Sequence, residues 1–138
     1  MALAMFVDTS VMVCIAIGEA DADRYVRALC MATTKLLPAP AYLECAMVLH
    51  GRLGALSTVR LADVLGLAEI TIEPFSTNMA ALAIQAFHTY GKGRHKAGLN
   101  FGDCLVYGAA KELGFPLLYK GEDFVQTGIA SVFNQSHY

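Results

Sequence analysis

The sequence lacks tryptophan, is poor in charged residues and carries no large excess of charge of either sign. Only 16% of its 138 residues are charged, the net charge is −2, and 56% of the residues are hydrophobic. So high an apolar fraction excludes an intrinsically disordered chain, and the length suits one domain with a sizeable core. The charge balance gives no sign of a nucleic-acid-binding protein, so such an activity would need a local basic patch.

The chain also lacks a cysteine motif. No two of its four cysteines form a Cys-x-x-Cys pair, and no spacing of Cys and His suits zinc. Each cysteine lies in an apolar stretch that we expect to be helical, so we expect buried free thiols in a reducing cytosol. The four are Cys14, Cys30, Cys45 and Cys104.

No apolar run is long enough to cross a membrane. The segment 1–18 is the one to check, but it contains Asp8 and no Lys or Arg precedes its apolar residues. A carboxylate inside a membrane helix would cost about 2.5–3.5 kcal/mol, and the run after Ser10 is far shorter than a span. We therefore expect a soluble cytoplasmic protein in which this segment forms a strand and a helix.

The N-terminal segment contains a short apolar run that ends on three polar residues. Residues 3–7 are all apolar and too few for a buried helix, which indicates a strand covered on both faces. Asp8 follows, and Thr9 or Ser10 is a natural N-cap for a helix over 11–17. Asp8 then lies at the carboxyl end of a parallel strand, where open α/β sheets bind ligands, unless it only caps the helix.

The rest of the chain alternates in the same way between short apolar or β-branched runs and longer runs with helical periodicity. We therefore predict an α/β fold with three α/β/α layers and a central parallel sheet of four to five strands. A single domain would span residues 1–133, followed by a polar tail at 134–138. The further strands are expected at 35–38, 69–72, 115–119 and 129–133, and the helices from residue 21 or 23, from 40 to about 51 or 54, and over 57–67, 77–87 and 104–113.

Four acidic residues share one placement in this predicted fold. Asp8 and Asp123 directly follow strands, and Glu44 and Asp103 lie in or near the first turns of helices. In a parallel sheet all four lie at the carboxyl edge, where mutual repulsion makes their burial costly. Mg²⁺ or Mn²⁺ would relieve this repulsion, because both prefer hard oxygen ligands. Such an ion polarises a phosphodiester and activates water as a nucleophile.

Two polar residues next to Asp8 suit the same site. Thr9 and Ser10 would support a bound metal as hydrogen-bond donors beside the carboxylates. The spacing leaves a second interpretation open, in which the four carboxylates are scattered helix caps.

A polar, glycine-rich loop precedes Asp103. Its cations are Lys92, Arg94 and Lys96. If the acids lie together, this loop overhangs them and contacts the phosphates of a phosphodiester substrate, with the Arg guanidinium binding phosphate through two N–H groups. The alternative is a solvated loop without a ligand.

At these residues the chain resembles a known family. Four motifs, spread in order over nearly the whole chain, are similar to those of the PIN domain, and in particular to the toxin branch of VapBC toxin–antitoxin pairs. They are VDTS (7–10), PAYLE (40–44), LNFGDC (99–104) and LYKGEDF (118–124). Members of this branch often carry a further Asp near the position of Gly128.

The resemblance implies a Mg²⁺- or Mn²⁺-dependent ribonuclease whose acidic pocket is formed by Asp8, Glu44, Asp103 and Asp123. Asp8 and Asp103 would be the main metal ligands, and Glu44 would bind metal or orient the attacking water. Asp123 is the fourth acid, although the adjacent Glu122 competes for that role.

The resemblance also implies partners and supporting residues. Thr9 and Asn100 match polar positions that support the pocket. The implied substrate is RNA, such as tRNA or another structured RNA, and the implied protein partner is a VapB-like antitoxin. The high apolar fraction separately favours a homodimer, or a groove filled by the antitoxin.

Two other functions fit part of the pattern. A phosphotransfer or phosphatase-type domain would use Asp8 as the phosphoryl acceptor, but Ser10 stands where such hydrolases usually carry a second Asp. A non-catalytic module would keep the fold and bind RNA or protein, but the presence of all four acids gives that interpretation no support.

Overall fold

The computed structural model describes residues 3–134 as a parallel sheet with helices packed against it. The elements follow in the order β1 (Ala4–Val7), α1 (Thr9–Ile17), α2 (Ala22–Cys30), β2 (Thr34–Pro38), α3 (Ala39–Leu53), η1 (Gly54–Leu56), α4 (Ser57–Leu67), β3 (Thr71–Glu73), α5 (Thr77–Tyr90), α6 (Phe101–Leu113), β4 (Leu117–Leu118) and η2 (Val132–Asn134), where η denotes a 3₁₀ helix.

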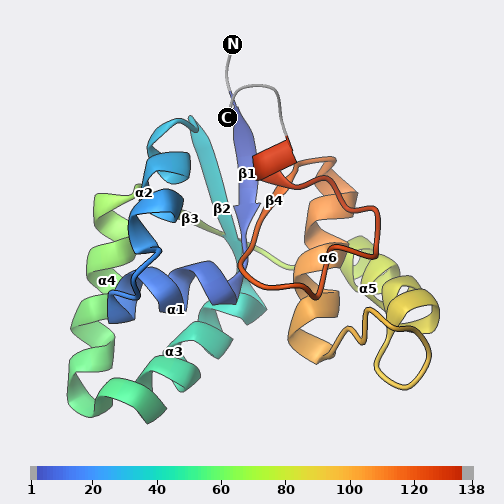
Figure 1. The fold of residues 1–138 in the computed structure, drawn as a ribbon, viewed down its shortest axis with the longest axis horizontal. Helices are drawn as coiled ribbons and strands as arrows, with labels where there is room; N and C mark the ends of the chain where they lie inside the picture. Colours follow the sequence, from blue (N-terminus) through green and yellow to red (C-terminus); the bar gives the residue numbers. More distant parts are fainter. Residues whose placement is uncertain (1–2, 135–138) are drawn as a thin grey trace.

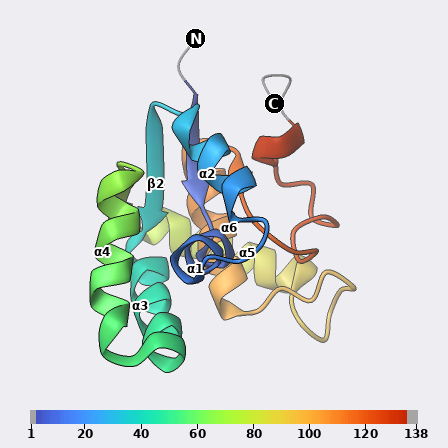
Figure 2. The same cartoon turned by 60° about the vertical axis from the view of Figure 1, so that its left-hand side comes forward.

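The four strands form one sheet in the order β3-β2-β1-β4, and all neighbouring strands are parallel. Figure 1 shows the blue-to-green helices α1 to α4 on one side of the molecule and α5 with α6 on the other. After rotation, α1 to α4 come forward and α5 and α6 lie behind them (Figure 2). The predicted three-layer α/β fold with a parallel sheet is therefore confirmed, with four strands.

β1 lies between β2 and β4 and is covered on both faces. Its residues Met5, Phe6 and Val7 are fully buried, and so are Leu117 and Leu118 of β4. An unbroken apolar run is what a strand between two helical layers requires, so the predicted buried strand is confirmed. Because the strands are parallel, their carboxyl ends meet at one edge, and α1 and α3 begin there directly after β1 and β2.

The edge strands differ from the expected ones. β3 begins later than predicted, because the chain turns at Glu69, whose φ of 55° lies in the left-handed region. β4 is short and follows Pro116, which has no N–H to donate to a neighbouring strand. The strand expected at 129–133 is wrong: Ser131 makes an isolated bridge with Leu117, and the chain then turns into η2.

Three of the four cysteines are buried and free, as expected. Cys30 is exposed instead, because it is the last residue of α2 and lies off the buried face of that helix. None of the described helices is both long and apolar enough to cross a membrane. Residues 135–138 of the predicted tail lie outside the described part of the chain.

Candidate functional site

Asp8 lies directly after β1 and is the N-cap of α1. Its Oδ2 accepts hydrogen bonds from the Ser10 N–H (3.0 Å) and the Ser10 hydroxyl (2.5 Å). The prediction that Thr9 or Ser10 caps this helix is therefore wrong, because the Asp8 carboxylate takes the free N–H. The Ser10 hydroxyl also accepts a hydrogen bond from the Lys120 N–H (3.0 Å), which joins the start of α1 to the end of β4.

The Asp8 carboxyl is buried, with only 6% of the residue exposed. Burial raises the pKa of Asp8 to about 6. The hydrogen bonds from Ser10 oppose this rise, and the negative charges of Glu44 and Asp123 add to it. Three of the four predicted acids are thus close enough to influence one another.

Glu44 reaches the same place from α3. The Thr9 hydroxyl donates a 2.7 Å hydrogen bond to Glu44 Oε1, which ties α3 to the first residue of α1. On its other side the carboxylate lies against Gly102 in the first turn of α6, where an added Cβ would stand 2.5 Å from Glu44 Oε2. Gly102 therefore makes room for Glu44.

Asp103 is held at the start of α6 by a reciprocal cap. The Asp103 N–H donates to Asn100 Oδ1 (2.9 Å), and the Asn100 N–H donates to Asp103 Oδ2 (3.1 Å). Burial raises the pKa of Asp103 to about 7, and the Asn100 N–H works against that rise. Hydrogen bonding and charge from Asp123, together with the charge of Asp8, raise it further.

The segment after β4 distinguishes Asp123 from Glu122. Both residues are exposed. The charge of Asp123 acts on Asp8 and Asp103, whereas Glu122 lines a separate cavity with Arg24 and Tyr25. Asp123 is therefore the member of the pair that belongs with the other acids.

The structure thus brings all four predicted acids to the carboxyl edge of the sheet. They offer only hard oxygen atoms, and the raised pKa values of Asp8 and Asp103 record the cost of placing carboxylates together away from water. This donor chemistry fits Mg²⁺ or Mn²⁺. As the side chains stand, however, no three His, Cys, Asp or Glu residues between 3 and 134 are arranged to hold a metal ion.

The basic loop lies between α5 and α6, closed by a bridge between Gly91 and Leu99. Lys92, Arg94 and Lys96 are all exposed on it. The Arg94 guanidinium lies 5.1 Å from the centre of the Phe87 ring at the end of α5. The loop leads into the cap that holds Asp103, so its cations lie in the segment next to the acids.

Two residues near the site were not recognised from the sequence. Gly102 was passed over, although a glycine inside the first turn of a helix is itself a signal of close packing. The second is Lys120, whose Nζ forms ion pairs with Asp21 (2.8 Å) and Glu19 (3.3 Å).

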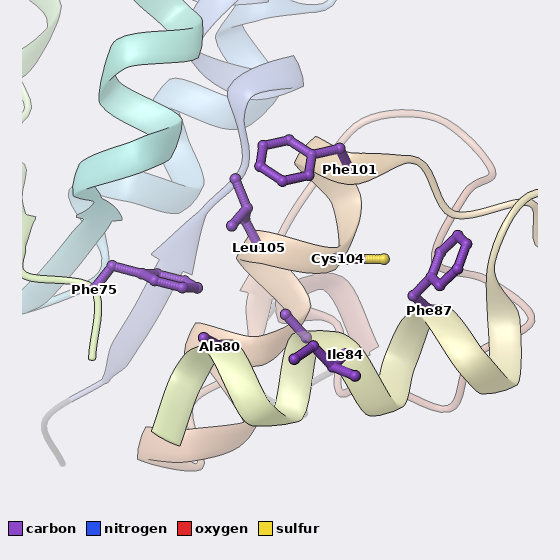
Figure 3. Close-up of a pocket in the computed structure, with 8 residues that line it drawn as sticks. Phe75, Ala80, Ile84, Phe87, Phe101, Cys104 and Leu105 are labelled. Carbon is purple, nitrogen blue, oxygen red and sulfur yellow. The ribbon is translucent and has the colours of Figure 1, made fainter. Parts of the chain in front are cut away.

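An apolar cavity of about 420 Å³ lies between α5 and α6. Figure 3 shows Phe75, Ile84, Phe87, Phe101 and Leu105 around it. Phe101, two positions before Asp103, is 79% exposed and stands at its edge. The cavity therefore borders the turn that carries one of the acids.

The family model for the PIN domain matches residues 5–130. This chain belongs to the PIN domain family. It is 43% identical over 128 residues to the VapC ribonuclease Mb0640 of Mycobacterium bovis, covering 93% of this chain and 98% of that protein. It is 39% identical over 128 residues to the ribonuclease VapC of Mycolicibacterium smegmatis, covering 93% and 99%. The resemblance predicted from the four motifs is confirmed.

Solved structures share the fold of this PIN domain at much lower identity. The crystal structure of VapC20 from Mycobacterium tuberculosis, a sarcin–ricin loop cleaving toxin, has a TM-score of 0.73 at 18% identity, covering 92% of this chain and 97% of that chain. VapBC2 from Rickettsia felis, bound to a DNA fragment from its promoter, has a TM-score of 0.74 at 14% identity, covering 94% and 96%.

Proposed function

We propose that this PIN domain is a metal-dependent endoribonuclease and the toxin of a type II toxin–antitoxin pair. The observation that carries the proposal is the meeting of Asp8, Glu44, Asp103 and Asp123, from four separate segments, at one edge of the sheet. Relatives about 40% identical over nearly the whole chain are named VapC ribonucleases, which favours this function over the phosphotransfer and non-catalytic alternatives.

Asp8 and Asp103 would be the main ligands of Mg²⁺ or Mn²⁺, with Glu44 and Asp123 at its periphery. When bound, the ion supplies positive charge that polarises the phosphodiester and makes water a better nucleophile at neutral pH. Binding requires Asp8 and Asp103 to lose their protons, and their pKa values of about 6 and 7 make this deprotonation favourable above neutral pH.

The neighbouring residues hold the carboxylates in position and assist the transfer of a proton from water. Thr9 and Gly102 hold the Glu44 carboxylate in place, so that Glu44 can accept a proton from the attacking water. Ser10 and Asn100 fix the orientation of the carboxylates of Asp8 and Asp103 in the same way.

The substrate would be RNA, such as tRNA or another structured RNA. The exposed Lys92, Arg94 and Lys96 are suited to contact phosphates on one side of the acids. Hydrolysis by in-line attack of water on the phosphorus would leave a 5′-phosphate and a 3′-hydroxyl. An RNA substrate would place the protein in the cytoplasm.

The protein partners would be a VapB-like antitoxin and a second copy of this chain. The Rickettsia felis structure contains a VapBC pair, which supports an antitoxin partner. The apolar cavity between α5 and α6, with Phe101 exposed beside it, supports self-association (Figure 3). Light scattering would show a dimer for the native chain and a monomer for Phe101→Glu. A native monomer at all concentrations would contradict the dimer.

The function is tested by cleavage of end-labelled total tRNA with the purified protein in Mg²⁺, Mn²⁺ or EDTA. We expect cutting only with metal, and none by Asp8→Asn. The conservative substitution keeps the size of the side chain and the capping oxygen, so that variant should stay folded. Cutting that persists in EDTA or in Asp8→Asn would refute the proposal.

A further inference from the structure

A second cavity lies beside the segment that carries Asp123. It has a volume of about 630 Å³ and is bounded by the start of α2, the end of β4 and the chain from residue 121 to residue 133. Gly121, Glu122 and Phe124 belong to its wall, so Asp123 stands between two of its lining residues. An RNA strand bound at the acids could therefore continue into this cavity.

The cavity contains a cation, Arg24, that forms no ion pair with a carboxylate of residues 3–134. The Arg24 guanidinium lies over the Phe133 ring, 3.8 Å from its centre, and 5.8 Å from the centre of the Tyr25 ring. Between residues 3 and 134 the ion pairs are confined to Lys120, so the charge of Arg24 stays available there to an anionic ligand. The contact with the Phe133 ring keeps the guanidinium at the cavity.

The other walls are mixed in character. The half-buried Tyr119 packs on the buried Phe124, with ring centres 5.1 Å apart, and Tyr25 is buried at the base of the cavity. Glu122 and the tyrosines add polar residues to the lining. Aromatic faces combined with a few hydrogen-bonding groups and one arginine are what proteins use to hold an unpaired base.

This lining contrasts with that of the cavity between α5 and α6. There the walls are alanine, isoleucine, leucine, phenylalanine and one cysteine, without a charged side chain. Such walls suit another protein surface, whereas a cavity with an unneutralised guanidinium suits a phosphate-bearing ligand.

We propose that this cavity binds one unpaired nucleotide of the RNA strand, next to the phosphodiester held at the acids. Its base stacks on Tyr119, the half-buried ring of the wall, and Arg24 contacts its phosphate. The inference rests on the proposed function, since it assigns a subsite to the same substrate. It follows that the enzyme requires a single-stranded residue beside the cleaved bond.

The test measures RNA binding in the Asp8→Asn background, so that the probe is not cut. Fluorescein-labelled twelve-nucleotide oligouridine and oligoadenosine are titrated by fluorescence anisotropy at several salt concentrations, with a twelve-base-pair RNA duplex as competitor. Arg24→Ala is compared with Arg27→Ala, the neighbouring exposed arginine of α2, which does not line the cavity.

A second pair of variants tests the cavity without removing the arginine. Val125→Asp adds a carboxylate at a wall residue that is 54% exposed, so the core is not disturbed. Val59→Asp makes the same change on α4, at a residue that is 59% exposed and distant in sequence from the cavity.

We expect Arg24→Ala and Val125→Asp to weaken binding of the single-stranded oligonucleotides about tenfold, which corresponds to the contribution of one stacked base or less. Arg24→Ala should also reduce the slope of log binding constant against log salt concentration by about 1, as expected for the loss of one phosphate contact. Arg27→Ala and Val59→Asp should stay within about twofold of the background.

Two results would overturn the inference. Equal effects of Arg24→Ala and Arg27→Ala, or unchanged binding by Val125→Asp, would show that the cavity takes no nucleotide, while cleavage by the native chain would keep the proposed function intact. Failure of the native chain to cut RNA, together with failure of the Asp8→Asn variant to bind it, would refute both proposals.

Discussion

Replacing Gly102 by Ala should lower the ribonuclease activity strongly while leaving the free energy of unfolding almost unchanged. The added Cβ would lie 2.5 Å from Glu44 Oε2 and 2.9 Å from Oε1, closer than any van der Waals contact allows. The atoms in its way are the end of a flexible side chain, so the Glu44 carboxylate moves by about 1 Å rather than the helix. A displacement of that size at a catalytic group typically costs about 100-fold in rate.

The free energy of unfolding should change little in the same variant. Alanine gains up to about 1 kcal/mol over glycine inside a helix, and losing the hydrogen bond from Thr9 to Glu44 costs about as much. The assay compares kcat/KM for tRNA cleavage with the melting temperature. Full activity in Gly102→Ala would refute the role given to Glu44.

Gly108→Ala on the same helix is the matched control. There the new Cβ would meet the Met79 carbonyl oxygen and, at 2.9 Å, the Ala83 backbone nitrogen, neither of which can move without shifting α5. We expect this variant to lose about 1–3 kcal/mol of stability. Together the two glycines separate an effect on the site from an effect on packing.

Further predictions concern charge and hydrogen bonding. Burial raises the pKa of Asp8 to about 6 and of Asp103 to about 7, above the 3.8 of a free Asp, so folding takes up protons and the metal-free protein loses stability as the pH rises from about 4 to about 8. Melting curves should show this loss, and Asp103→Asn should reduce it; a melting temperature that rises with pH would contradict the assignment. Thr9→Val removes the hydrogen bond to Glu44 and should slow cleavage about tenfold while costing about 1 kcal/mol of stability, whereas an unchanged rate would show that the bond is not needed. Lys120→Ala breaks two solvent-screened ion pairs and should leave the midpoint of urea unfolding almost unchanged; a large fall in the midpoint would mean that Lys120 does more than pair with Asp21 and Glu19.

The sheet was predictable because its central strand carries an unambiguous pattern. Residues 3–7 are all apolar, and only a strand buried on both faces explains so short a run. The edge strands were less predictable, since the positive φ of Glu69 and the missing N–H of Pro116 act locally and leave the hydrophobic pattern unchanged. The segment 129–133 is apolar like a strand, but its burial comes from packing rather than from sheet pairing.

The placement of the acids was predictable in part. Asp8 and Glu44 follow from topology, because parallel strands bring the helices that directly follow them to one edge. Asp103 does not, since α6 follows α5 and the basic loop rather than a strand. The choice between Glu122 and Asp123 needed the path of the chain after β4. The ion pairs of Lys120 join residues about one hundred positions apart, a distance over which sequence spacing carries no signal.

The most direct test of the four-carboxylate site is a Mn²⁺ titration in which binding, by calorimetry, and cleavage of tRNA are followed on the same sample. The account predicts that activity rises in step with occupancy in the native chain, and that Asp103→Asn loses both activity and metal binding while its melting temperature is no lower than that of the metal-free native chain. Cleavage at full rate in EDTA, or metal binding that is unchanged in Asp103→Asn, would contradict it.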